Sequence, residues 1–173
     1  MRRFAFFHSF RFSLVGAAIL ASAACSNDST TGTSSRTPLL SLVASSAESE
    51  QDFAWGPAPA VFEKGAEMAV LQGDPSKAEP FTVRLRFPNG YKINPHTHPT
   101  AENVTVLKGT FLAGMGEKFV ESNMKAFGRD GFASIPANHA HYAMARGQTI
   151  VQVHATGPFQ LTYVNPADDP SKR

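Results

Sequence analysis

The stretch Gly90-Tyr-Lys-Ile-Asn-Pro-His96-Thr-His98-Pro-Thr-Ala-Glu102, followed by Gly109, determines how this chain is interpreted. Two histidines at positions i and i+2 of a strand point to the same side of a sheet, so one segment can direct two imidazoles to one point. Pro99 cannot continue a central strand ladder, and a bend after His98 would let Glu102 return to that point from the next strand.

A second histidine-bearing segment reads Gly131-Phe-Ala-Ser-Ile-Pro136-Ala-Asn-His139-Ala-His141. It predicts a strand, a turn and a new strand headed by histidine. Asn138 is well suited to a turn position with positive φ, because asparagine tolerates the left-handed region better than most residues. Imidazoles and a carboxylate together suit a divalent first-row metal ion.

The sequence around these segments predicts short antiparallel strands. Residues 81–87 alternate strictly, with Phe81, Val83, Leu85 and Phe87 on one face. Further strands are expected at residues 67–71, 91–97, 102–107, 110–115, 124–127, 132–135, 141–145, 149–155 and 159–164. Turn residues separate them, among them Lys108-Gly109 and Arg146-Gly147. This spacing is typical of an all-β sandwich or barrel.

The two histidine segments resemble the motifs of the cupin superfamily. The first motif, G-x5-H-x-H-x3-E-x6-G, is matched at every defined position by Gly90, His96, His98, Glu102 and Gly109. The second, G-x5-P-x-G-x2-H-x3-N, is matched less well: Gly131 stands one residue closer to Pro136, Asn138 replaces the inner glycine, and Ala145 replaces the final asparagine.

The resemblance implies a single-domain cupin double-stranded β-helix, or jelly-roll barrel, over residues 52–165, followed by an exposed tail at 166–173. It also implies one divalent transition metal (Fe, Mn, Zn or Ni) held by His96, His98, Glu102 and His141. Three neutral imidazoles and one carboxylate leave such an ion with a net charge of +1. An octahedral ion keeps two positions for water, substrate or O₂.

Other polar residues are weaker site candidates. His139 shares strand parity with His141 and competes with it, although the spacing from Pro136 favours His141. Gln152 and His154 alternate with valines, and would contact substrate or orient a ligand if their face lines the pocket. The alternative is a solvent-facing, hydrogen-bonded pair. Several of the phenylalanines, Phe159 among them, are expected in the core or as apolar pocket walls.

The first 24 residues are expected to be a secretory signal peptide. Arg2, Arg3 and Arg11 accompany an apolar stretch that is too short to span a bilayer and that ends in small residues before Cys25. The segment Leu20-Ala-Ser-Ala-Ala-Cys25 resembles a bacterial lipoprotein signal, which implies lipidation of Cys25, export and a periplasmic location. Residues 25–51 are rich in Ser and Thr and predict a flexible tether.

Composition excludes several functional classes. The chain is 42% hydrophobic and 17% charged, which suits one globular domain. Three of its 16 basic residues precede Cys25, so 13 remain against 14 acidic ones, and nothing supports nucleic-acid binding. A single cysteine excludes an internal disulfide and a cysteine-rich zinc module. Membrane contact is expected only through the lipid anchor.

Three functions remain open for the predicted site. The first is an O₂-dependent, dioxygenase-like oxidoreductase that acts on a small molecule; the second is oxalate-type decarboxylation, which needs a further acid or base near the metal. The third is a non-catalytic module that binds or senses a metal or small ligand. The fold cannot choose among them. By analogy, a homodimer through the sheets is possible, with residues 58–62 exchanging between subunits.

Overall fold

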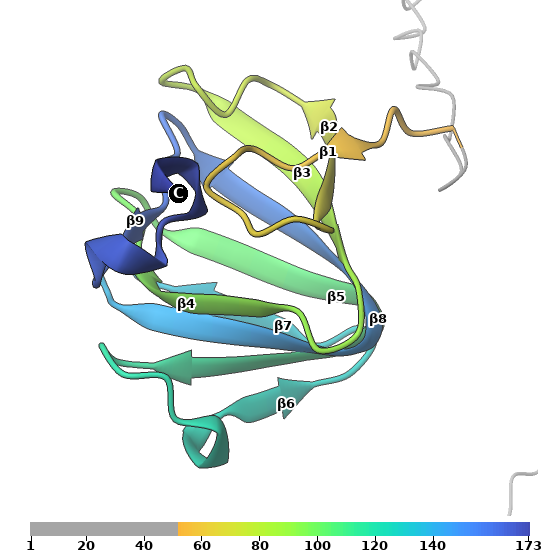
Figure 1. Cartoon of the computed structure of the whole chain (residues 1–173). Coiled ribbons are helices and arrows are strands. Elements are labelled where there is room, and N and C mark those ends of the chain that lie inside the picture. Colours follow the sequence, from red (N-terminus) through yellow and green to blue (C-terminus); the bar gives the residue numbers. More distant parts are fainter. Residues whose placement is uncertain (1–51) are drawn as a thin grey trace, which may run out of the picture. The chain divides into compact units, whose positions relative to one another are not determined.

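The computed structural model describes residues 52–173, and they form nine strands joined by loops (Figure 1). The expected signal peptide, Cys25 and the expected tether lie outside the described residues. The strands are β1 (Gly56–Pro57), β2 (Glu67–Gln72), β3 (Pro80–Phe87), β4 (Lys92–Thr97), β5 (Glu102–Met115), β6 (Lys125–Phe127), β7 (Phe132–Ile135), β8 (His141–Thr156) and β9 (Thr162–Tyr163).

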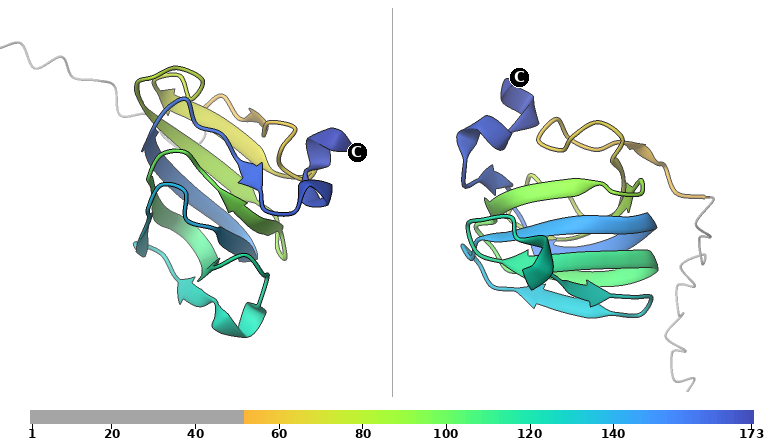
Figure 2. Two further views of the ribbon diagram at one scale, coloured as in Figure 1. Left: turned by 90° about the vertical axis from the view of Figure 1, so that its left-hand side faces the viewer. Right: turned by 60° about the horizontal axis from the view of Figure 1, so that its bottom comes forward.

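The nine strands make one continuous antiparallel sheet that folds back on itself. The second half of β8 pairs with β3 and with the first half of β5, while its first half pairs with β4 and with the second half of β5. Two sheet halves, β1-β2-β3-β8-β5-β7 and β9-β4-β8-β5-β6, therefore share the long strands β5 and β8 and face each other (Figures 1 and 2). The all-β cupin fold predicted from the sequence is confirmed.

The core lies between the two sheet halves. Strand β3 contributes Phe81, Val83, Leu85 and Phe87, all buried, as their alternation predicts. Its Arg84 and Arg86 lie on the outer face, where they stack over the rings of Phe53 and Trp55. Burial of the alternating apolar residues drives the pairing of the two halves, because each buried Leu or Phe side chain contributes about 1.5–3 kcal/mol.

Two predicted turns are in fact bends within single strands. Lys108-Gly109 and Arg146-Gly147 were expected to separate strands, but β5 and β8 run through them. The register of β5 against β8 shifts on both sides of Lys108, and Gly109 and Gly147 have positive φ. Bulges of this kind bend a strand without ending it, which is how β5 and β8 enter both sheet halves. Local turn chemistry cannot distinguish a bulge from a hairpin.

The last residues are more ordered than an exposed tail. Residues 159–164 were predicted as a strand, but only Thr162–Tyr163 pair. Beyond them, Pro166–Asp168 and Pro170–Lys172 form two 3₁₀ turns, capped by the side chains of Asn165 and Asp169. Within residues 52–173, no helix has the length and apolar character needed to cross a membrane.

Candidate metal centre

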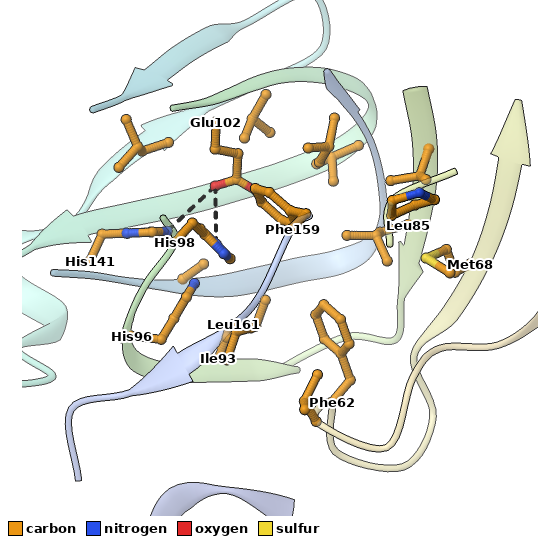
Figure 3. A pocket seen from close by; sticks show the side chains of 18 of the residues that line it. Phe62, Met68, Leu85, Ile93, His96, His98, Glu102, His141, Phe159 and Leu161 are labelled. Carbon is orange, nitrogen blue, oxygen red and sulfur yellow. Dashed lines mark ion pairs between the residues drawn. The ribbon is translucent and has the colours of Figure 1, made fainter. Parts of the chain in front are cut away.

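Three histidines converge from two neighbouring strands. His96 lies on β4 directly opposite His141 on β8, and His98 follows the end of β4. All three side chains are buried, and a nitrogen of each lies within 4.8 Å of the others (Figure 3). They are close enough that one metal ion could be bound by all three.

A bulge in β4 turns its histidines inward. The register between β4 and β8 shifts between Ile93 and His96, around Pro95, which has no N–H for the ladder. Ile93 and His96 therefore both face the interior, although they are an odd number of positions, three, apart in the sequence. The positive φ of Asn138, 61°, confirms the expected turn before His141.

Hydrogen bonds fix the orientation of every one of these imidazoles. The Nδ1 atoms of His96, His98 and His141 lie 2.7, 2.7 and 3.0 Å from the backbone carbonyl oxygens of Asn94, Gln160 and His139, respectively. A carbonyl can only accept, so Nδ1 carries the proton and donates it. In the neutral ring, Nε2 then presents its lone pair to the common centre, as a metal ligand does.

Burial keeps the rings of His96 and His98 neutral. It lowers the pKa of His98, and it holds the pKa of His96 well below the ordinary value of 6.5. The neighbouring rings of His141 and His98 lower the pKa of His96 further, because two protonated imidazoles side by side would repel each other. At neutral pH, His96 and His98 are thus in the protonation state that binds a metal ion.

Glu102, the first residue of β5, completes the cluster. One of its carboxylate oxygens, Oε2, lies 3.4 Å from Nε2 of His141 and 3.8 Å from Nε2 of His98. The dashed lines in Figure 3 mark these two contacts. Nε2 of His141 is buried and has no hydrogen-bond partner within residues 52–173. With Nδ1 protonated, this nitrogen and the carboxylate are both acceptors that face each other. A cation between them would satisfy both, so the donor set fits a divalent metal.

Phe159 packs against the imidazole of His98. Its ring is stacked on the imidazole, with centroids 4.1 Å apart and planes 18° apart, and it packs edge-on against Phe81. The next residue, Gln160, supplies the carbonyl that accepts from His98. The sequence had suggested Phe159 as a pocket wall, but nothing local indicated that the backbone of residue 160 would orient a histidine.

The other sequence candidates lie away from the cluster. Val151 and Val153 line the interior, so Gln152 and His154, of opposite parity, lie on the outer face, as in the alternative of a hydrogen-bonded pair outside the cavity. There they form a hydrogen-bonded row with Thr82 and Arg84 across the β3–β8 pair.

His139 also lies outside the centre. Its side chain is exposed, with Nδ1 3.1 Å from the carbonyl oxygen of Ala137. Its contribution is the backbone carbonyl that accepts from Nδ1 of His141. The spacing from Pro136 that favoured His141 over His139 thus agrees with the positions of the two rings.

A cavity of about 140 Å³ adjoins the histidines, between the two sheet halves. Apart from His96, His98, Glu102 and His141, every side chain that lines it is apolar. Sequence reasoning missed Phe62, which closes one side together with Pro59 and Val61. These residues belong to the segment that was considered for exchange between subunits. The hydroxyl of Tyr163 donates to the carbonyl of Val61 in this segment.

Comparison with known proteins agrees with this architecture. Residues 47–160 match the family described as the ChrR cupin-like domain. No curated protein matched the chain.

Several solved structures share the fold. The polyketide cyclase RemF from Streptomyces resistomycificus is 16% identical, with a TM-score of 0.59 over 72% of this chain and 89% of that one. A protein described as a candidate acetylacetone dioxygenase from Methylibium petroleiphilum PM1 is 21% identical, with a TM-score of 0.54 over 71% and 83%. An RmlC-like cupin from Shewanella frigidimarina NCIMB 400 is 14% identical, with a TM-score of 0.51 over 64% and 90%. At these identities, the likeness concerns the fold alone.

Proposed function

The chain belongs to the ChrR cupin-like domain family, and from this premise we propose that it is a mononuclear metal-dependent enzyme, a dioxygenase-like oxidoreductase that acts on a small molecule. One observation carries the proposal: three buried histidines, each with Nδ1 beside a backbone carbonyl, gather with Glu102 around one point, where the buried Nε2 of His141 has no hydrogen-bond partner within residues 52–173. Acceptors gathered in this way without a cation would destabilise the fold.

The protein's own groups prepare the centre for a ligand. The carbonyls of Asn94, Gln160 and His139 hold the imidazoles in the tautomer that binds metal. Glu102 contributes the single negative charge. A bound divalent ion would polarise an oxygen donor of the ligand and, if it is iron or manganese, could exchange electrons with O₂. The apolar walls around it exclude water from the reacting groups.

Non-catalytic binding is the alternative, and the composition of the cavity favours it in one respect. The four residues of the cluster are the only ionisable side chains among those that line the cavity. No further residue is therefore placed there as a general acid or base. The same observation argues against oxalate-type decarboxylation, which needs such a group.

Metal content tests the centre. The purified protein should contain close to one transition metal ion per chain, and His96→Ala should lose it while remaining folded. His154→Ala, which removes an exposed histidine from the outer face, serves as the matched control and should keep full occupancy. Unchanged occupancy in His96→Ala would refute the assignment of this ligand.

Oxygen uptake separates the enzyme from the binding module. The iron-loaded protein should consume O₂ in the presence of at least one member of a panel of catechols, diketones and small acids. If no compound causes uptake while metal occupancy is complete, the function is binding or sensing.

The proposal includes export and a lipid anchor at Cys25. Its support is the signal-like sequence before that residue. Labelling of the expressed protein with a radioactive fatty acid should be lost in Cys25→Ser. An unlabelled wild-type protein would leave ordinary secretion as the better description.

A further inference from the structure

The cavity beside the histidines has two chemically different ends. At one end lie His96, His98, Glu102 and His141, and away from them the wall is formed by apolar side chains, among them Phe62, Met68 and Leu85 (Figure 3). Among the residues that line it there is no lysine, arginine, hydroxyl or amide side chain. A ligand can therefore find polar partners only at the histidine end.

The volume limits what the apolar end can hold. The cavity measures about 140 Å³, and apolar cavities of roughly 150 Å³ in proteins hold a molecule of the size of benzene. A ligand body of about five or six carbon atoms fits this space. Hydroxyl-rich bodies such as sugars would bury groups without partners, at a cost of about 1–3 kcal/mol for each group.

The net charge of the metal centre limits how many negative charges a ligand can carry. Three neutral imidazoles and one carboxylate leave a divalent ion with a net charge of +1, which one negative charge on the ligand neutralises. A second negative charge would have to lie among apolar side chains with no cation to pair with it, and burying such a charge is strongly unfavourable.

From these two limits, and resting on the metal centre of the proposed function, we infer that the cavity takes a compact apolar monoanion. Its single oxygen-donor head, a carboxylate or an enolate, binds at the metal, and its hydrocarbon body of about five or six carbon atoms fills the space toward Phe62, Met68 and Leu85. Dicarboxylates too long to bring both carboxylates to the metal, such as glutarate, are disfavoured by the same walls.

Pentanoate and glutarate test the charge limit, because both have five carbons and differ in the second carboxylate. Binding is measured by calorimetry on the Zn²⁺-loaded protein, so that no turnover is required. Pentanoate should bind at least tenfold more tightly than glutarate. The affinity of hexane-2,4-dione, which binds metals as an enolate, is compared with that of pentanoate. The compound that binds more tightly identifies the preferred head group.

A series from acetate to pentanoate tests the apolar end. Affinity should rise roughly fourfold with each methylene, as expected for burial of a CH₂ group. Leu85→Phe should flatten this series and leave acetate binding unchanged, since it fills the space for the body and not for the head. If Leu85→Phe does not fold, Met68→Phe, at a less buried position of the same wall, should have the same effect. Val70→Ile, at an exposed position on β2, is the matched control.

Two results would overturn the inference: glutarate binding as tightly as pentanoate, or a flat series in the wild-type protein. Metal content is measured on the same samples. A protein that holds zinc but shows either result refutes the ligand class and leaves the metal centre standing, whereas a protein that holds no zinc refutes the proposed function itself.

Discussion

The protonation of single side chains controls the candidate centre. Each histidine donates through Nδ1 to a backbone carbonyl, so its Nε2 is available only while the ring is neutral. Burial lowers the pKa of His96 and His98 and so favours this neutral form. In the unfolded chain these rings return to a pKa of about 6.5.

This difference predicts acid sensitivity of the metal-free protein. Below pH 6.5 the unfolded chain binds protons that the folded chain does not, so stability falls as the pH decreases and is fully present above pH 6.5. Each histidine contributes a slope of up to about 1.4 kcal/mol per pH unit. Urea midpoints measured between pH 8 and pH 5 in the presence of a chelator should show the loss.

Matched variants separate this slope from that of other groups. His96→Asn should flatten the decrease between pH 6.5 and pH 5, whereas Val70→Ile, at an exposed position and with no change in titratable groups, should leave it unchanged. Equal slopes in the wild type and in His96→Asn would contradict the burial of a neutral His96.

At the scale of the element, the bends of β5 and β8 determine how the sheet closes. Gly109 and Gly147 both have positive φ, 74° and 73°, but their surroundings differ. A Cβ atom at Gly109 would lie 2.4 Å from the carbonyl oxygen of Gln148, whereas at Gly147 nothing lies within 4 Å. Gly109 therefore serves both the backbone conformation and a close approach of two strands.

The two glycines offer a paired test. Gly147→Ala should cost only the strain of a side chain at positive φ, about 1 kcal/mol. Gly109→Ala has the same strain plus a collision with backbone, and it should destabilise by about 2 kcal/mol more. Chemical denaturation of both variants measures the difference. Equal losses would mean that the bend at Gly109 does not require the close contact.

At the scale of the whole molecule, the candidate ligands belong to both sheet halves. His96 and His141 lie in the half that contains β4, while Glu102 begins the part of β5 that pairs with β7 and with the second half of β8. A metal ion bound by all of them would join the two halves at the end of the cavity. Because it binds only the folded state, it would stabilise the entire domain.

Zinc should therefore raise the unfolding temperature of the metal-free protein. At a free concentration of 100 times Kd the gain is about 2.7 kcal/mol, or roughly 10 °C for a domain of this size. Addition of a chelator should reverse it. Glu102→Gln should reduce the shift, because it removes the one charged ligand, whereas Glu121→Gln, on the exposed loop before β6, should not. A zinc shift equal in Glu102→Gln would exclude Glu102 from the site.

Most of the strands and the grouping of the candidate ligands can be predicted from the sequence, although the ends of β5, β8 and β9 cannot. Alternation in residues 81–87 predicts which face of β3 is buried, because the two faces of a strand alternate whatever the partner. The spacing of His96, His98 and Glu102, together with the turn before His141, likewise indicates a shared point, since local backbone geometry places them.

Only the tertiary structure decided what surrounds that point. Val151 and Val153 face the cavity and Gln152 and His154 face outward because of how β8 pairs with β3, and parity alone cannot say which set is inside. The carbonyl of Gln160 and the ring of Phe62 reach the site from segments distant in sequence. Such contacts depend on how the sheet folds back on itself, which no short stretch of residues specifies.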